Sequence, residues 1–270
     1  MIAVPADQPK VSVCLVTYNH EPFIEQAIQS VLAQDTSFPI EIVIGDDCST
    51  DRTREIIAAL ASKFPNRIRP FFQEANRGLV PNFIDTYDSC RGEYVALLDG
   101  DDYWTSSEKL AKQIRFLDDR PACSICFHDV AVLLADGTFC PQNYTNPAQQ
   151  PFAKIDDLLR TNFIATCSAV FRRHLLPRLP EWFGSLEWED WALYILLAEQ
   201  GTIGYLPDVL GVYRLHGRGL WSRLDRVARI EAEIRFLKTI DVHLDYQYTA
   251  GIKRSVEERQ MRLADESEPR

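Results

Sequence analysis

The chain has 270 residues, of which 46% are hydrophobic and 25% charged, proportions that are ordinary for a globular protein. No apolar run approaches the ~20 residues of a membrane-spanning helix, and residues 1–10 lack the basic and apolar segments of a signal peptide. A net charge of −10 argues against nucleic acid as a partner, although a divalent cation can still neutralise the phosphates of a single nucleotide.

The first 110 residues alternate between short apolar runs and amphipathic helical stretches. Strands are expected at 11–16, 41–44, 68–72 and 94–98, and helices at 21–33 and 79–90. A further helix follows the second strand, and its inner face is predicted to carry Ile56, Ile57, Leu60 and Phe64. This alternation predicts a mostly parallel sheet with helices on both faces.

The second half is less regular. Strands are expected at 124–133, near 169–171, at 203–206 and at 209–213, and helices at 189–200 and 227–240. A loop-rich stretch extends from residue 134 to residue 151. Because there is no internal repeat and no Pro/Gly/Ser-rich linker, we predict one continuous α/β domain followed by a C-terminal helical extension.

Two acidic clusters follow predicted strands. Asp46 and Asp47 come after strand 41–44, and Asp99, Asp101 and Asp102 come after strand 94–98. Ligands of parallel α/β sheets bind at the carboxyl ends of the strands. Three carboxylates within four residues repel one another unless a cation or a donor satisfies them, and hard oxygen ligands suit Mg²⁺ or Mn²⁺. The alternative is an ordinary acidic turn that caps the next helix.

Five ordered segments resemble the opening of a family 2 glycosyltransferase. They are residues 11–20 (VSVCLVTYNH), 30–34 (SVLAQ), 44–53 (IGDDCSTDRT), 76–78 (NRG) and 92–102 (GEYVALLDGDD). The similarity covers residues 11–104 and continues more weakly to about residue 222. It implies a single-domain, Rossmann-like GT-A fold over residues 1–222, with a nucleotide-sugar-binding half to about 110, an acceptor half over 111–222 and an extension over 223–270. It also implies a nucleotide-diphosphate-sugar donor and inversion at the anomeric carbon.

The resemblance also implies roles for individual residues. Asp47 falls on the position that accepts the ring N–H of the base in uridine-nucleotide members. Asp99 and Asp101 match the family's Asp-x-Asp motif, and Asp102 is commonly close to the metal. The implied nucleotide-binding residues are Thr17, Tyr18, Asn19, Asp47, Asn76, Asp99 and Gly100, and the implied ligands of Mn²⁺ or Mg²⁺ are Asp99, Asp101, Asp102 and His216.

The segment 187–193 (EWEDWAL) begins the predicted helix 189–200. Family members carry at this place the carboxylate that deprotonates the acceptor hydroxyl, which makes Asp190 the candidate base and Glu189 a candidate acceptor contact. Either carboxylate could instead only complement the helix dipole. Of the three nearby tryptophans, Trp182, Trp188 and Trp191, we expect Trp188 to line the acceptor cleft, although tryptophans more often pack into a core.

The segment 213–217 (YRLHG) resembles a Tyr-Arg-x-His segment that occurs in part of the family. His216 is therefore a candidate metal ligand and Arg214 a candidate diphosphate contact, against the simpler alternative that His216 is a satisfied polar residue. The neighbouring Gly217 and Gly219 suggest a mobile loop, to which Arg218 and Arg223 would lend positive charge once the donor is bound.

Together these features predict a metal-dependent inverting glycosyltransferase that uses a UDP- or dTDP-sugar donor. One alternative is a sugar nucleotidyltransferase, but the sequence has no Gly-rich basic loop near the N-terminus, which argues against it. The other alternative is a non-catalytic nucleotide-sugar-binding module. Seven scattered cysteines predict reduced thiols and a cytoplasmic protein. The default acceptor is a carbohydrate or lipid-linked glycan in cell-surface polysaccharide assembly, which would bring the enzyme to the inner face of the membrane as a peripheral protein. The sequence predicts no oligomeric state.

Overall fold

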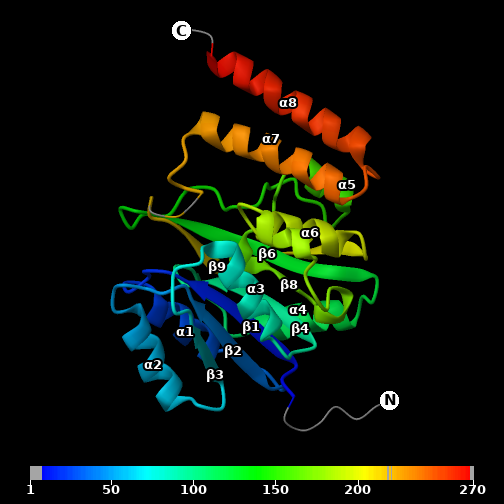
Figure 1. The fold of residues 1–270 in the computed structure, drawn as a ribbon. Coiled ribbons are helices and arrows are strands. Elements are labelled where there is room, and N and C mark those ends of the chain that lie inside the picture. The colour runs from blue at the N-terminus through cyan, green and yellow to red at the C-terminus, as the bar shows by residue number, and fades with distance from the viewer. Residues whose placement is uncertain (1–7, 218, 220, 268–270) are drawn as a thin grey trace.

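A nine-stranded sheet forms the centre of the computed structural model, which describes residues 8–217, 219 and 221–267 (Figure 1). The strand order is β3-β2-β1-β4-β8-β6-β9-β5, and β7 also pairs with β9. The strands are β1 (Val11–Thr17), β2 (Ile40–Asp46), β3 (Ile68–Phe72), β4 (Tyr94–Asp99), β5 (Tyr103–Trp104), β6 (Cys123–Leu134), β7 (Phe152–Ala153), β8 (Val170–Arg172) and β9 (Thr202–Leu215).

Most of the long strands point the same way. β1 is parallel to both β2 and β4, and β3 is parallel to β2. The short strand β8 is antiparallel to both β4 and β6, so β6 and its parallel neighbour β9 run in the same direction as β1. The short strands β5 and β7 pair with β9 in the antiparallel sense. The predicted mostly parallel sheet is confirmed.

Helices cover both faces of this sheet. They are α1 (Ile24–Leu32), α2 (Thr53–Lys63), α3 (Leu79–Asp88), α4 (Lys109–Asp118), α5 (Ile155–Arg160), α6 (Asp190–Ala198), α7 (Arg226–His243) and α8 (Thr249–Ser267). Side chains of β1 alternate between the faces: Val13 belongs to the core that includes residues of α1, α2 and α4, whereas Cys14 belongs to the core that includes residues of α3 and α6. Figure 1 shows α7 and α8 stacked outside α6, and α7 buries Ile230, Ile234 and Leu237 in the same core as Cys14.

Some local predictions need correction. Phe64 does not face the core: it follows the last residue of α2 with φ −128° and ψ 56°, and it is 37% exposed. Residues 203–206 and 209–213 are not separate strands, because β9 runs continuously through both.

Among the described helices, none is both long and apolar enough to cross a bilayer. Residues 1–7, on which the expectation of no signal peptide partly rests, lie outside the described residues.

Candidate active site

The site begins where three neighbouring parallel strands end. The register pairs Thr17 with Asp46 across β1 and β2, and Val16 with Asp99 across β1 and β4. Backbone hydrogen bonds continue this register beyond the strands, from Asp47 N to Thr17 O at 3.0 Å and from Gly100 N to Val16 O at 2.9 Å. The two acidic clusters therefore lie at the same edge of the sheet, as predicted.

The loops that follow β1 and β2 are fastened to each other. Asn19 and Cys48 both have left-handed backbones, with φ of 55° and 61°. Asn19 Oδ1 accepts a hydrogen bond from Thr50 N at 2.8 Å. The Asn19 side chain thus links the loop after β1 to the loop after β2. The left-handed φ of Cys48 is a conformation that Gly and Asn adopt more readily than other residues.

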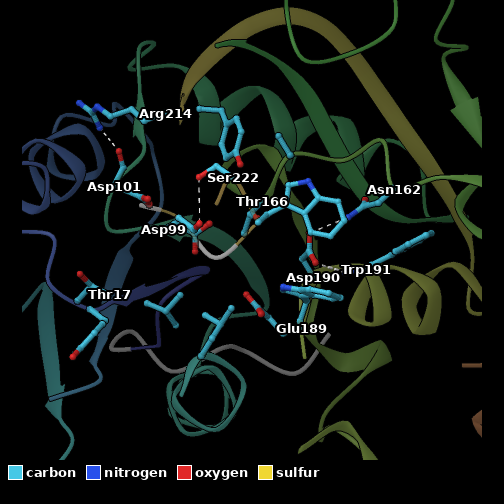
Figure 2. Close-up of a pocket in the computed structure, with 18 of the residues that line it drawn as sticks. Thr17, Asp99, Asp101, Asn162, Thr166, Glu189, Asp190, Trp191, Arg214 and Ser222 are labelled. Atoms are coloured by element: carbon cyan, nitrogen blue, oxygen red, sulfur yellow. Dashed lines mark hydrogen bonds between the residues drawn. The ribbon is translucent and has the colours of Figure 1, made fainter. Parts of the chain in front are cut away.

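A cavity of about 600 Å³ opens at this edge and is bordered by both halves of the chain (Figure 2). From the first half, its wall includes the predicted residues Thr17, Tyr18, Asp47, Asn76, Asp99 and Asp101. From the second half, it includes Trp188, Glu189, Asp190 and Arg214. In Figure 2, Asp99 lies between Asp101 on one side and Asp190 on the other. The predicted nucleotide-binding and catalytic residues thus largely share one cavity.

Asp47 is held by the loop that precedes α3. Its Oδ1 accepts a hydrogen bond from Arg77 N at 2.8 Å, and its Oδ2 accepts one from Gly78 N at 2.9 Å. Asn76 Nδ2 donates to the Asp47 backbone carbonyl at 3.1 Å. These bonds fix the carboxylate while each oxygen keeps a second lone pair. Asp47 can therefore accept a further hydrogen bond from a ligand in the cavity.

The carboxylates of Asp99, Asp101 and Asp102 form one cluster, in which one oxygen from each lies within 4.8 Å of the others. Burial and the negative charges of Asp101 and Asp190 raise the pKa of Asp99. Burial and the charges of Asp101 and Asp99 raise the pKa of Asp102 in the same way. Negative charge at this place is thus poorly neutralised by the protein, and the all-oxygen donor set fits a divalent cation.

Two histidines and an arginine surround Asp101. His216 Nε2 lies 2.8 Å from Asp101 Oδ2, and His20 Nε2 lies 3.7 Å from the same oxygen. Burial opposes ionisation of Asp101, but the hydrogen bond from His216 and the charge of His20 outweigh it and lower the pKa. Arg214 donates its backbone N–H to Asp102 Oδ1 at 2.8 Å and its guanidinium to the Asp101 carbonyl. His216 Nε2 is thus engaged by Asp101, so ligation of a metal by this atom requires that contact to open.

Gly100 and His20 show how closely this edge is packed. A Cβ atom at Gly100 would lie 2.5 Å from Thr17 Oγ1 and 2.8 Å from His20 Nδ1, so the close approach excludes any side chain. Thr17 Oγ1 and His20 Nδ1 are themselves 3.1 Å apart. His20 was not predicted as a site residue. Its place at the end of the segment 11–20, which resembles the family, is the sequence feature that could have identified it.

Asp190 is the first residue of α6. Its Oδ2 accepts a hydrogen bond from Asn162 Nδ2 at 2.9 Å, and its Oδ1 accepts one from Trp191 N at 2.7 Å. Burial raises the pKa of Asp190. The neighbouring Glu189 is 5% exposed, and its Oε2 has no hydrogen-bond partner among the described residues. Asp190 is thus oriented by two donors, whereas this Glu189 oxygen has none.

The three tryptophans differ in position. Trp188 borders the cavity and meets Trp221 edge-to-face, with ring centroids 5.3 Å apart. Trp191 also borders it, but its Nε1 donates to Leu158 O at 2.9 Å, and its ring belongs to the core. Trp182 stacks on His243 at 4.3 Å. Of these three, Trp188 and Trp191 therefore border the cavity, as Trp221 also does.

Several wall residues were not identified from sequence. Asn162 comes from the segment after α5, and Glu233 and Phe236 come from α7. No motif surrounds these positions, so sequence carries no local signal for them. Arg223 also borders the cavity, whereas Arg218 lies outside the part of the chain that the structure describes.

Comparison with known proteins identifies the family. Residues 12–179 match the model of glycosyl transferase family 2. An uncharacterized protein of Mycobacterium tuberculosis is 39% identical over 214 residues, which cover 78% of this chain and 60% of that protein. The chain thus spans about 60% of the length of this mycobacterial relative. TuaG of Bacillus subtilis, provisionally named as a teichuronic acid biosynthesis glycosyltransferase, is 30% identical over 230 residues, which cover 82% and 85% of the two chains.

Solved structures share the fold at lower identity. Residues 1–349 of TarS from Staphylococcus aureus, in complex with UDP-GlcNAc, superpose with a TM-score of 0.64 at 22% identity, covering 86% of this chain and 66% of that one. A mannosyltransferase from Pyrobaculum calidifontis, in complex with GDP-Man and Mn²⁺, gives 0.63 at 20% identity, covering 97% and 77%. The chain therefore belongs to glycosyl transferase family 2 and adopts the GT-A fold.

Proposed function

We propose that this protein is a metal-dependent, inverting glycosyltransferase that moves a sugar from a UDP- or dTDP-sugar to an acceptor hydroxyl. One observation carries the proposal: Asp47, the cluster residues Asp99 and Asp101, and Asp190 border the same cavity. Such a reaction requires recognition of the nucleotide, stabilisation of the leaving diphosphate and activation of the acceptor. We assign these three functions to Asp47, to the acidic cluster and to Asp190, in that order.

Asp47 is proposed to select the base. When ionised it only accepts hydrogen bonds, so it pairs with the N3–H of uracil or thymine and also with the N1–H of guanine. Cytosine presents a lone pair at N3 instead, which would face the carboxylate. Tyr18 lies 42% exposed at the cavity wall, where its ring can flank a base. The related folds bind both UDP-GlcNAc and GDP-Man, so the fold alone does not choose between uracil and guanine.

Asp99, Asp101 and Asp102 would hold Mn²⁺ or Mg²⁺, with His216 as a further candidate ligand. When bound, the metal supplies positive charge that stabilises the departing diphosphate. The protein contributes the side chains that keep these carboxylates in place: His20 lies next to Asp101, and the Arg214 backbone N–H binds Asp102. The guanidinium of Arg214 is a candidate contact for the diphosphate itself.

Asp190 is proposed to take the proton from the acceptor hydroxyl as that oxygen attacks the anomeric carbon. Hydrogen bonds from Asn162 and Trp191 favour its ionised form, which a base requires. Burial and the charges of Asp190 and Asp99 raise the pKa of Glu189 well above its ordinary value. Asp190 is therefore the better base of the two. Attack from the side opposite the leaving group inverts the anomeric configuration.

The reaction products separate this proposal from the two alternatives. Incubation with UDP- and dTDP-sugars in Mn²⁺ should release nucleoside diphosphate, and release should stop in excess chelator and return when Mn²⁺ is restored. Pyrophosphate consumption or release would instead indicate a sugar nucleotidyltransferase. Tight nucleotide-sugar binding without turnover, whatever acceptor is supplied, would indicate a binding module. The polysaccharide or lipid-linked acceptor, and a peripheral place at the membrane surface, stay predictions that rest on family analogy.

A further inference from the structure

The cavity continues beyond Asp190 to the C-terminal helices. Glu233 and Phe236, both on α7, border it together with Trp188 and Trp191. Phe236 is 5% exposed and stacks on Trp191, with ring centroids 4.6 Å apart and an interplanar angle of 17°. The segment after residue 222 is therefore part of the cavity wall, although the sequence suggested only an appended helical extension.

Glu233 is held in place by a buried arginine of α8. Arg259 Nε donates to Glu233 Oε2 at 2.6 Å. Arg259 is only 3% exposed, and its other nitrogens donate to Ser255 O at 3.1 Å, to Ser255 Oγ at 2.8 Å and to Arg160 O at 3.0 Å. Among the described residues only Arg259 donates a hydrogen bond to the carboxylate of Glu233, and that bond uses Oε2. The second oxygen, Oε1, is left for a donor from outside the protein.

The chemistry of this part of the wall suits an uncharged sugar. The aromatic ring of Trp188 offers a flat apolar surface to the C–H face of a pyranose. Glu189, Asp190 and Glu233 offer carboxylate oxygens to hydroxyl donors, and Glu189 Oε2 is a buried oxygen that lacks a partner among the described residues. The ionised carboxylate of Asp190 in this wall also disfavours a ligand that places its own negative charge beside it, such as a uronic acid.

We propose that the α7–α8 pair completes an acceptor subsite for an uncharged pyranose, in which Glu233 accepts a hydrogen bond from an acceptor hydroxyl. Arg259 acts as a positioning residue because it reaches the ligand only through Glu233. The inference rests on the proposed transferase function and extends it by naming the acceptor class. It also gives the C-terminal helices a direct role in substrate choice.

The test compares acceptors and a matched pair of variants. UDP release from a UDP-hexose in Mn²⁺ is measured with p-nitrophenyl glucopyranoside and with p-nitrophenyl glucuronide as acceptors. The neutral glycoside should stimulate UDP release and the glucuronide should not. Glu233→Gln keeps the size of the side chain and an oxygen for Arg259, and it should raise the acceptor KM about tenfold while UDP affinity is retained. Glu231→Gln, on the exposed side of the same helix, should leave the acceptor KM unchanged.

Equal stimulation by the glucuronide, or an unchanged acceptor KM in Glu233→Gln, would overturn the subsite. UDP binding also reports folding of each variant, so a loss of structure is not mistaken for a loss of acceptor affinity. Failure of the underlying function has a different signature, because the wild-type protein would then release no UDP from any donor, with or without acceptor.

Discussion

At the scale of single residues, the adjacent carboxylates Glu189 and Asp190 show how surroundings assign different roles to similar groups. Asp190 receives hydrogen bonds from Asn162 and Trp191, which favour its charged form. Glu189 is buried, and one of its oxygens has no partner among the described residues, which disfavours its charged form. A base must be ionised before the proton arrives, so the two environments favour Asp190.

Asp190→Asn is the corresponding mutation. The amide keeps the size of the side chain and removes its capacity to accept a proton, so turnover should fall by about 10²–10⁴ while the affinity for UDP is retained. Steady-state UDP release and calorimetric UDP binding measure the two quantities. Glu189→Gln is the matched control and should lose less activity. Near-normal turnover in Asp190→Asn would contradict the assignment and direct attention to Glu189.

The site residues differ in whether the sequence could predict them. Asp47 and the acidic cluster follow strands whose apolar runs are clear in the sequence, so their shared edge was predictable. Asn162 and Glu233 could not be predicted, because each reaches the cavity only through tertiary packing of a segment that has no motif. The family resemblance, not spacing, pointed to Asp190.

At the scale of elements, α4 shows why one helix was missed, and α8 shows why a helix inside the predicted extension over 223–270 was not delimited. Buried positions of α4 mix Leu110 and Ile114 with Lys109 and Gln113, which weakens the apolar periodicity. Buried positions of α8 include the polar side chains of Ser255 and Arg259 in the same way.

The sequence predicted two strands, 203–206 and 209–213, where β9 is continuous, and the reason is different. Pro207 and Asp208 interrupt its apolar pattern, but the ladder with β6 absorbs them in a register shift between the pairs His128–Leu206 and Asp129–Val209. This irregularity in the ladder lets the strand continue through a proline.

Lys109 gives α4 a testable property. It is fully buried at the first position of the helix, its Nζ lies 3.7 Å from the centroid of the Trp104 ring, and burial lowers its pKa to about 7. An unfolded chain holds this proton up to about pH 10. Between these values the unfolded state binds one proton more than the folded state, so stability should rise with pH across this interval. Below about pH 7 Lys109 is charged in both states, and the free-energy cost of burying that charge then lowers the stability in full.

Lys109→Met removes the charge and keeps most of the side-chain length. The variant should therefore melt at a higher temperature than the wild type below pH 7, and the difference should shrink as the pH approaches 10. Thermal unfolding at pH 6.5 and pH 9.5 measures this trend. A difference in melting temperature that does not change with pH would show that Lys109 is not neutralised in the folded protein.

At the scale of the whole molecule, the two halves of the chain differed in how far they could be predicted. In the first 110 residues, β1, β2 and β3 pair in chain order through intervening helices, and β4 returns to pair with β1, so the apolar runs of these four strands are clear from local periodicity. The second half joins the sheet through β8, which links β4 to β6 by antiparallel pairs between distant segments. Local pattern does not encode that pairing, nor the packing of α7 against the cavity.

The central claim is that Asp47 and the acidic cluster form one donor site, and calorimetric titration of nucleoside diphosphates tests it most directly. In Mn²⁺, UDP and dTDP should bind about tenfold or more tightly than CDP, because cytosine would leave buried polar groups unpaired opposite Asp47. In excess chelator the binding of UDP should be strongly weakened. CDP binding as tight as that of UDP, or UDP binding that is unchanged in chelator, would contradict the account.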